Sequence, residues 1–307
     1  MDSHIRSDFL QLMQDIVGEE HVLTNEEMKK HTTFRVGGPA DYFVVPHSAD
    51  EVVSVCCLCR EEEIPVHILG NGSNLLVMDE GVRGVVIQVA DNLSEYSVDE
   101  EAGTLTFEAG VSLAKAAQVA CEAGLTGLEF ASGIPGTVGG GTRMNCGAYG
   151  GEIADCILWA KVADESGDAF RLPKKKLDFG YRQSAIEKNH YVVLEVGMKL
   201  DSGDPDTIRG TMQEYNRKRR EKQPLEYPSA GSTFKRPEGN YAGALIEEAG
   251  MKGYTIGGAK VSEKHAGFIV NTGDATPADI ANLIAVVQQR VREKTGVSLE
   301  PEVKFWK

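Results

Sequence analysis

A glycine-rich segment, SGIPGTVGGGTRMNCGAYGGE at residues 132–152, constrains the fold of this chain more than any other feature. It is too long for an ordinary connection inside a compact domain, and so much glycine makes ordering the backbone costly in conformational entropy. A large bound ligand can offset that cost, because binding stabilises the ordered state. The segment therefore favours a fold that wraps around an extended ligand.

A second glycine loop, LGNGSNLLV at residues 69–77, directly follows a predicted strand at 66–69. Its glycines allow successive backbone N–H groups to converge on an anion. It is not a dinucleotide fingerprint, because Leu75 stands where the third glycine belongs, and no Gly-Lys-Ser/Thr follows as in a P-loop. Alone, the loop favours a tight turn. Together, the two loops predict a nucleotide cofactor with a pyrophosphate at one end and a flat ring at the other.

The composition excludes several classes of protein. A chain of 307 residues is long enough for two or three domains. The net charge of −14 argues against a nucleic-acid partner, because phosphate backbones are bound by surplus Lys and Arg. The first 20 residues lack the apolar stretch of a signal peptide, and no run is long enough to span a membrane, so we expect a cytoplasmic protein.

The cysteines are expected to be reduced and structural. Cys56 and Cys59 recur at helical spacing with Val52 and Val53 in ADEVVSVCCLCREEE, as small core residues do. No matching set of ligands at zinc-like spacing occurs elsewhere, so no metal site is predicted.

The pattern of elements is mixed. We predict helices at about 5–17, 49–59, 113–123, 205–220, 242–249 and 277–295, and strands at 41–45, 66–69, 157–163 and near 191–200, 265–271 and 297–306. Thr276 is a predicted N-cap with Pro277 at the first helical position, and Gly124 a predicted C-terminal cap residue. A change of composition near residues 202–205 marks the expected domain boundary.

Eight motifs in this chain resemble, in order, those of the UDP-N-acetylenolpyruvoylglucosamine reductases, in the shorter variety of that family. They are TTFRVGGPADYFV, LGNGSNLLV, GIPGTVGG, NCGAYGGE, FGYRQS, PSAGSTFKRP, KHAGFIVN and EPEVKF, and they extend from about Thr32 to Trp306. The resemblance implies an α+β fold of the vanillyl-alcohol-oxidase type. Residues 1–70, with a C-terminal strand at 301–307, are then FAD-binding subdomain 1, residues 71–203 are FAD-binding subdomain 2, and residues 204–300 are the substrate-binding domain.

The resemblance also implies an activity. NADPH reduces a non-covalently bound FAD, which then reduces UDP-N-acetylglucosamine enolpyruvate to UDP-N-acetylmuramate in peptidoglycan precursor synthesis. The pathway builds the cell wall and so serves cell shape and cell division. No obligate protein partner or membrane is implied. Two alternatives remain: a flavin-dependent oxidase on the same fold, and a non-catalytic nucleotide-sugar binding protein.

The cofactor residues that the resemblance implies lie in the two glycine loops. At the pyrophosphate they are Gly70, Asn71, Gly72, Ser73 and Asn74, and along the rest of FAD they are Gly133, Ile134, Pro135, Gly136, Gly139 and Gly140.

Three residues are assigned to the chemistry. Hydride addition to an enolpyruvyl ether leaves negative charge next to a carboxylate, and that charge must be stabilised and protonated. Arg182 can bind the carboxylate through two parallel hydrogen bonds; the residue alone favours a surface salt bridge, and the family resemblance favours the catalytic role. Glu302 is assigned near the carboxyl group, and its alternative is a solvated carboxylate at a strand edge. Ser232 matches the proton donor of the family, and Lys235 is expected to assist it.

Other residues receive lesser roles. Ser229 is expected only to turn the chain, and His265 to pack or to bind a backbone group. Lys222 matches a family lysine that contacts the substrate diphosphate, and Tyr149 is expected to contact the substrate. The basic residues 217–219 suit a helix C-terminus.

The chain departs from the usual family pattern in two places. Thr142, Arg143 and Cys146 stand where family members more often have apolar or small residues and an aromatic residue, close to the expected flavin site. Arg236 stands where some members have asparagine.

Overall fold

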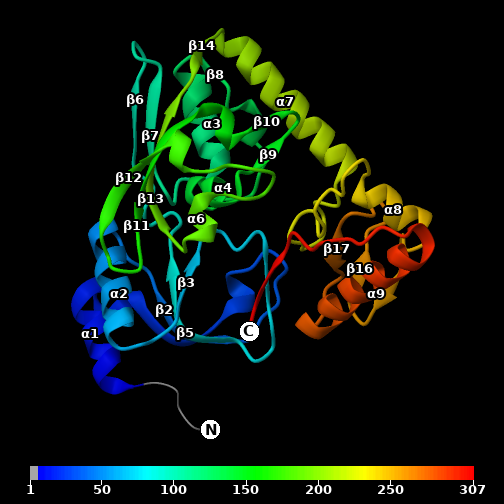
Figure 1. Cartoon of the computed structure of the whole chain (residues 1–307), viewed down its shortest axis with the longest axis horizontal. Coiled ribbons are helices and arrows are strands. Elements are labelled where there is room, and N and C mark those ends of the chain that lie inside the picture. Colours follow the sequence, from blue (N-terminus) through cyan, green and yellow to red (C-terminus); the bar gives the residue numbers. More distant parts are fainter. Residues whose placement is uncertain (1–5) are drawn as a thin grey trace. The chain divides into compact units, whose positions relative to one another are not determined.

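The computed structural model of the chain describes residues 6–307 and combines helices with strands in an α+β arrangement (Figure 1). Its internal contacts define two compact units, each made of segments that are distant in the sequence. Unit 1 comprises the described residues up to Thr24, Tyr42–Asn71 and Gly84–Lys218. Unit 2 comprises Asn25–Asp41, Gly72–Arg83 and Arg219–Lys307. The three-part division expected from the sequence stays a prediction.

The helices agree closely with the sequence pattern. Their bounds are α1 Ser7–Val17, α2 Ala49–Glu61, α3 Leu113–Glu122, α4 Val138–Met144, α5 Ile153–Cys156, α6 Ala185–Lys188, α7 Pro205–Lys222, α8 Ala242–Glu248 and α9 Pro277–Thr295. Thr276 caps α9 by accepting from Asp279 N, and Gly296 ends it in the left-handed region, at φ 75°. Gly124 follows α3 at φ 65°, as expected of a terminating glycine. Ile5, the first residue of the predicted N-terminal helix, lies outside the described residues.

The strands are short. They are β1 Val22–Glu27, β2 Pro39–Val44, β3 Val66–Leu69, β4 Leu75–Val77, β5 Val82–Gln88, β6 Tyr96–Asp99, β7 Thr104–Glu108, β8 Leu125–Thr126, β9 Gly147–Ala148, β10 Gly151–Glu152, β11 Ile157–Ala163, β12 Ala169–Pro173, β13 Val192–Lys199, β14 Asp201–Ser202, β15 Thr255–Ile256, β16 Ala259–Val261, β17 Ile269–Asn271 and β18 Lys304–Trp306. The main sheets have the orders β1-β2-β5-β3 and β12-β11-β13-β7-β6, and the second is antiparallel throughout.

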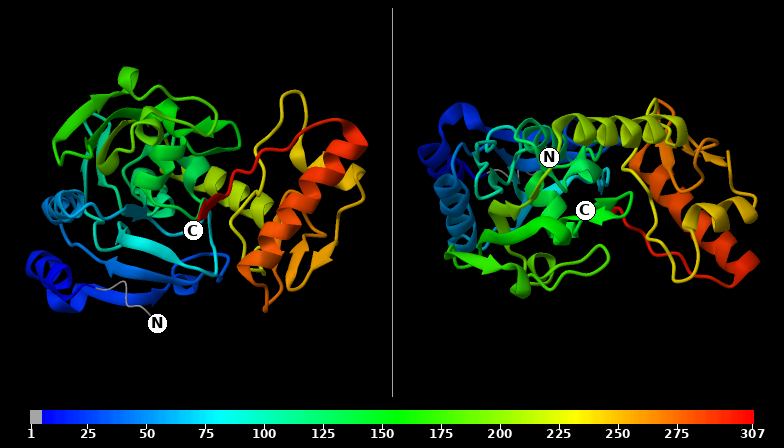
Figure 2. Two further views of the ribbon diagram at one scale, coloured as in Figure 1. Left: turned by 60° about the horizontal axis from the view of Figure 1, so that its bottom comes forward. Right: turned by 90° about the horizontal axis from the view of Figure 1, so that it is seen from above.

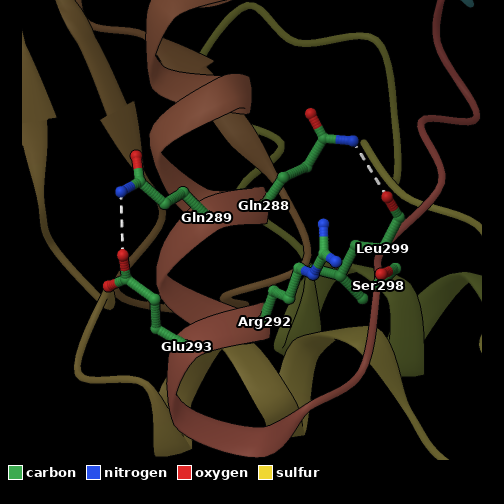
Figure 3. Close-up of a pocket in the computed structure, with 6 residues that line it drawn as sticks. All are labelled: Gln288, Gln289, Arg292, Glu293, Ser298 and Leu299. Atoms are coloured by element: carbon green, nitrogen blue, oxygen red, sulfur yellow. Dashed lines mark hydrogen bonds between the residues drawn. The ribbon is translucent and has the colours of Figure 1, made fainter.

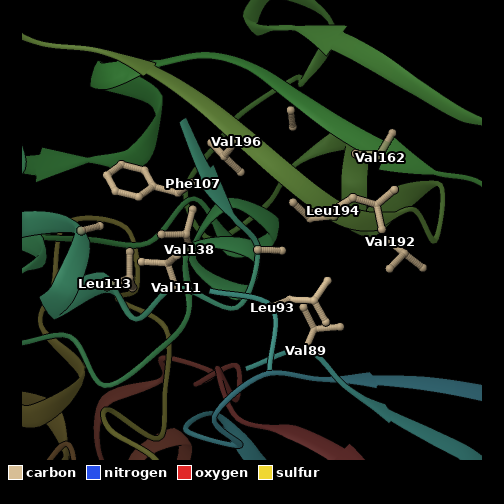
Figure 4. Close-up of a cluster of buried hydrophobic side chains, with 14 of the residues drawn as sticks. Val89, Leu93, Phe107, Val111, Leu113, Val138, Val162, Val192, Leu194 and Val196 are labelled. Atoms are coloured by element: carbon tan, nitrogen blue, oxygen red, sulfur yellow. The ribbon is translucent and has the colours of Figure 1, made fainter. Parts of the chain in front are cut away.

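Unit 1 has a core between its antiparallel sheet and the helices α3 and α4. Val138 of α4 and Phe107 of β7 belong to one buried cluster, together with Val196 of β13 (Figure 4). All three side chains are fully buried. The glycine-rich segment is thus anchored at Val138 to the core of the unit, which holds the start of α4 in place.

Unit 2 is built around α9, which packs against β15, β16 and β17 and against α8 (Figure 2). Ile280, Leu283 and Val287 recur along one face of α9, and all three are fully buried. The C-terminal strand β18 pairs in parallel with β4, at Leu75–Val77. Only 304–306 of the predicted terminal strand form a strand.

Two further observations concern the described residues as a whole. No helix within residues 6–307 is long and apolar enough to cross a membrane. All six cysteines are free thiols. Cys56 and Cys59 are buried on α2, as the helical spacing predicts, and burial raises the pKa of each thiol to about 12.

Candidate active site

The first glycine loop is fixed by its own neighbours in unit 2. Gly72 has φ 60°, and a Cβ there would collide with the carbonyl oxygen of His31, so only glycine fits. Thr33 donates to the Gly72 carbonyl from its N–H at 3.2 Å and from Oγ1 at 3.4 Å. The TTFRVGG motif therefore holds this loop in shape.

The two glycine loops meet within unit 1. A Cβ on Gly70 would lie 2.8 Å from Oγ1 of Thr137, so the first loop touches the second where α4 begins. The same Oγ1 accepts from Gly140 N at 3.2 Å and caps α4. The hypothesis that both loops serve one ligand requires this proximity.

Three adjacent glycines on α4 differ in what surrounds them. A Cβ on Gly139 would lie 2.8 Å from Cβ of Ala109, and one on Gly141 would lie 2.8 Å from Sγ of Cys146. Both glycines are therefore required by packing. Gly140 is exposed, and a Cβ there would meet only Thr137 Oγ1, at 3.4 Å. Protein packing does not explain Gly140, and its open face is where a cofactor can lie.

The FGYRQS loop docks onto the end of the glycine-rich segment. Asn145, which ends α4 at φ 46°, donates from Nδ2 to the Gly180 carbonyl at 3.1 Å, and Ser184 Oγ donates to the Arg143 carbonyl at 2.7 Å. Arg182 donates from Nη1 to the Asn145 carbonyl at 3.4 Å and from Nη2 to the Gly147 carbonyl at 3.2 Å. Arg182 is thus held beside the second glycine loop, in a left-handed backbone at φ 57°.

Tyr149 lies at the tip of the hairpin β9–β10. Tyr149 and Gly150 have φ values of 54° and 91°, so both central residues of this tight turn are left-handed. The Tyr149 hydroxyl donates to the Tyr215 carbonyl at 3.0 Å, and the two rings stack at 4.4 Å with an interplanar angle of 12°. Tyr149 is 40% exposed and presents an aromatic surface next to the loop that holds Arg182.

Within unit 2, the serine loop runs beside the segment before β18. Phe234 and Pro301 form an antiparallel bridge, and Glu302 N donates to the Thr233 carbonyl at 2.8 Å. Asn74 donates from Nδ2 to the Glu302 carbonyl at 3.0 Å. Ser232 is exposed, and Gly231 before it, at φ 73°, has no atom within 4 Å of its Cβ position. The structure therefore brings the assigned residues Asn74, Ser232 and Glu302 into one part of unit 2.

The cations of unit 2 and His265 differ in their surroundings. Lys235 pairs with Glu300 at 2.5 Å, so the ammonium expected to assist Ser232 has a carboxylate partner. Lys222 is exposed at the end of α7 and makes no ion pair within residues 6–307. His265 accepts from Gly267 N through Nδ1 at 3.1 Å, and its ring lies edge-on to Phe268, as expected of a packed histidine. Desolvation by burial lowers the pKa of His265.

Sequence reasoning missed Ser132 and Asn145. Ser132 is 9% exposed, and its Oγ has no hydrogen-bond partner among the described residues. An unsatisfied buried hydroxyl beside Gly133 fits a segment that is completed by a polar ligand. Asn145 gave a signal in the sequence, because asparagine after a helix commonly ends it in the left-handed region.

The described residues contain no cluster of three or more His, Cys, Asp and Glu side chains that could hold a metal ion. A pocket of about 440 Å³ lies on unit 2, at the C-terminal half of α9 (Figure 3). Its lining contains none of the assigned site residues: it consists of Gln288, Gln289, Arg292, Glu293, Ser298 and Leu299.

Comparisons with known proteins agree with this geometry. A family model described as an FAD binding domain matches residues 40–173, and one described as UDP-N-acetylenolpyruvoylglucosamine reductase, C-terminal domain, matches residues 223–306. A UDP-N-acetylenolpyruvoylglucosamine reductase from Clostridium botulinum is 53% identical over 97% of this chain and 96% of its own length. One from Caldanaerobacter subterraneus is 50% identical over 95% of this chain and 96% of its own length.

A solved structure of the same family is also similar to this chain. The crystal structure of UDP-N-acetylenolpyruvylglucosamine reductase from Thermus caldophilus matches with a TM-score of 0.79 and 38% identity, over 92% of this chain and 98% of the other. An alkyldihydroxyacetonephosphate synthase matches with a TM-score of 0.51 and 16% identity, over 64% of this chain and 41% of the other, which concerns the fold alone. The expected fold, an FAD-binding domain followed by a C-terminal domain, is confirmed.

Proposed function

The chain belongs to the UDP-N-acetylenolpyruvoylglucosamine reductase family, and we propose that it reduces UDP-N-acetylglucosamine enolpyruvate to UDP-N-acetylmuramate with bound FAD and NADPH. The observation that carries the proposal is the 53% identity to the reductase of Clostridium botulinum across nearly the whole chain. The contact between the two glycine loops at Gly70 and Thr137 supports it, because one cofactor can then reach both. We also propose that the reaction takes place in the cytoplasm.

FAD, when bound, accepts hydride from NADPH and passes it to the enolpyruvyl double bond. We assign it to the two glycine loops, with Gly70–Asn74 at the pyrophosphate and Gly133, Ile134, Pro135, Gly136, Gly139 and Gly140 along the remainder. The residues present fit such a group, since Gly140 leaves one face of α4 open and the buried hydroxyl of Ser132 lacks a partner. We propose that the cofactor is held without a covalent bond.

Arg182 is proposed to hold the substrate carboxylate. Its guanidinium has a fixed position, because two backbone carbonyls of the glycine-rich segment accept from Nη1 and Nη2. A planar, permanently charged group placed in advance stabilises charge that develops next to it without reorganising. The strained backbone at Arg182 is of the kind that persists at functional sites.

Ser232 is proposed to donate the proton, with Glu302 orienting the substrate carboxyl. The absence of atoms around Gly231 leaves room for a substrate to approach the exposed hydroxyl. The bridge between Phe234 and Pro301 keeps the serine loop and the Glu302 segment in a fixed register. Lys222 and Tyr149 are proposed to contact the diphosphate and the rest of the UDP-sugar.

The absorption spectrum of the purified protein tests the overall function. A yellow protein whose flavin bands bleach with NADPH and return on adding UDP-N-acetylglucosamine enolpyruvate is expected. Return of the bands with oxygen but not with the enolpyruvyl substrate would indicate an oxidase, and a colourless protein that binds no FAD would indicate a nucleotide-sugar binding protein. Acid precipitation should release the flavin into the supernatant, because we propose that FAD is held without a covalent bond to the protein.

A pair of serine variants tests the proton donor. Ser232→Ala should leave FAD binding and bleaching by NADPH nearly intact, while reoxidation by the substrate slows by about 100-fold or more, as expected for a lost general acid. Ser229→Ala is the matched control in the same loop and should change reoxidation far less. Equal single-turnover reoxidation rates in the two variants would show that Ser232 is not the donor.

A further inference from the structure

Lys264 joins the two sides of the turn that carries Lys222. Its ammonium donates to the carbonyl of Arg220, in the last turn of α7, at 2.7 Å, and it lies 3.7 Å from Oε2 of Glu226. Lys222 lies between these two residues in the sequence, and all four residues belong to unit 2. One side chain therefore holds the chain on either side of Lys222.

The turn after α7 is shaped by local hydrogen bonds. Gln223 N donates to the Arg219 carbonyl at 2.8 Å, and Leu225 N donates to the Gln223 carbonyl at 3.0 Å. Such bonds give the turn its shape, but they do not attach it to another part of the unit. Lys264 does so, because it is 44 residues away from Arg220 in the sequence.

The same contact completes the end of α7. The last four carbonyls of a helix have no partner within the helix, and a cation at this end is favourable to the helix dipole. Here the Arg219 carbonyl accepts from Gln223 N, and the Arg220 carbonyl accepts from the Lys264 ammonium. The backbone is therefore held up to the residues that directly precede Lys222.

Lys264 itself stands on a firm base. Its N–H donates to Ser262 Oγ at 3.1 Å, and the N–H of His265 donates to the same oxygen at 3.3 Å. Ser262 is buried, and its own N–H donates to the Phe268 carbonyl at 2.9 Å. The ammonium thus reaches α7 from a compact turn that is anchored in the unit.

We propose that Lys264 is a positioning residue, which fixes the turn after α7 so that the Lys222 ammonium is placed in advance for the diphosphate of the UDP-sugar. A lysine side chain loses conformational entropy when it is ordered on a ligand, and a backbone that is already ordered reduces the total cost. Lys222 is exposed and makes no ion pair within residues 6–307, so its ammonium is open to an anionic ligand. The inference rests on the proposed function, in which Lys222 contacts the diphosphate.

Variants of the holoenzyme at Lys264 test this role. Lys264→Met removes the charge at similar length, and Lys264→Arg keeps a cation that can donate to a carbonyl and pair with a carboxylate. The Kd of UDP-N-acetylglucosamine enolpyruvate for the oxidised enzyme, titrated through the flavin spectrum, should rise about tenfold in Lys264→Met. Lys264→Arg should restore most of the affinity. Bleaching of the flavin by NADPH should stay the same in both variants, because that half-reaction does not need the UDP-sugar.

A double-mutant cycle separates positioning from direct contact with the ligand. Lys222→Met should itself raise the Kd, and adding Lys264→Met to it should change the Kd by less than about twofold, because no ammonium is left to position. A tenfold increase that is repeated in the Lys222→Met background would show that Lys264 acts on the ligand by itself, and it would overturn the proposal. An unchanged Kd in either single variant would overturn it as well.

The controls exclude a general effect of charge or stability. Lys294→Met removes an exposed lysine from the last turn of α9, in the same unit, and it should change neither the Kd nor the bleaching. Bleaching by NADPH that slows in Lys264→Met as much as the Kd rises would indicate a general disturbance and would contradict the positioning role. A wild-type protein that binds FAD but neither binds nor reduces the UDP-sugar would instead contradict the proposed function.

Discussion

Gly140 offers the sharpest test of where the cofactor lies. A larger side chain there should stabilise the flavin-free protein but weaken the binding of FAD. Gly140→Leu places a side chain on the exposed face of α4, where Thr137 Oγ1, at 3.4 Å, is the only atom near the new Cβ. In the apoprotein, the substitution replaces glycine within a helix by a good helix former. The free energy of unfolding should therefore rise by about 0.5–1 kcal/mol.

The same side chain should obstruct FAD if the cofactor lies on this face. Overpacking by a few methylenes costs about 1–3 kcal/mol, which corresponds to a Kd for FAD that is raised roughly 5- to 150-fold. Urea unfolding of the flavin-free protein, followed by circular dichroism, measures the first quantity. Titration with FAD, followed by quenching of the flavin fluorescence, measures the second.

Gly139→Ala is the matched control, one residue earlier on the same helix. Its Cβ would lie 2.8 Å from Cβ and 3.0 Å from the carbonyl oxygen of Ala109, so it should destabilise the apoprotein by about 1–3 kcal/mol. An apoprotein that gains stability while losing FAD identifies the Gly140 face as the cofactor face. A Gly140→Leu protein with an unchanged Kd for FAD would refute this reasoning.

Three further predictions follow from the same geometry. Arg182→Lys keeps the charge but loses the planar fork, so reoxidation by substrate should slow while bleaching by NADPH stays the same; equal slowing of both half-reactions would contradict its role. Ser132→Ala removes a buried hydroxyl without a partner, so the flavin-free protein should be as stable or more stable, and a clear loss of stability in urea would contradict this. Tyr149→Gly relieves a left-handed backbone but loses the stack on Tyr215 and the hydrogen bond to its carbonyl, so stability should change by less than about 1 kcal/mol while the KM for the UDP-sugar rises; an unchanged KM would exclude Tyr149 as a substrate contact.

Local signals in the sequence predicted most of the regular structure. The N-cap at Thr276, the proline after it and the glycine at 296 are short-range features, and α9 begins and ends where they indicate. The helical spacing of Val52, Cys56 and Cys59 likewise predicted a buried face of α2. Such features depend on neighbouring residues alone, so a single sequence is enough to predict them.

Contacts between distant segments could not be predicted in this way. Nothing in the glycine motifs shows that Gly70 touches Thr137, or that a C-terminal strand pairs with β4 directly after the first glycine loop. Both depend on the path of the chain, which returns to each unit several times. The ion pair of Lys235 with Glu300 joins distant segments in the same way, and the sequence pattern did not show it.

Three residues in the loops of the candidate site have a strained backbone. Asn145, Tyr149 and Arg182 all adopt left-handed conformations, at φ values of 46°, 54° and 57°. For residues other than glycine, each such conformation costs roughly 1–2 kcal/mol, and glycine would remove the cost. Asparagine tolerates this region better than most residues, and the Asn145 side chain makes two hydrogen bonds, to the Gly180 carbonyl and from Ala154 N. Tyrosine and arginine have no such relief, so their side chains must contribute more than the strain costs. Within the protein, Tyr149 stacks on Tyr215 and donates to its carbonyl, and Arg182 donates to two carbonyls of the glycine-rich segment and lies over the Tyr181 ring. We propose that a bound substrate adds to these contacts.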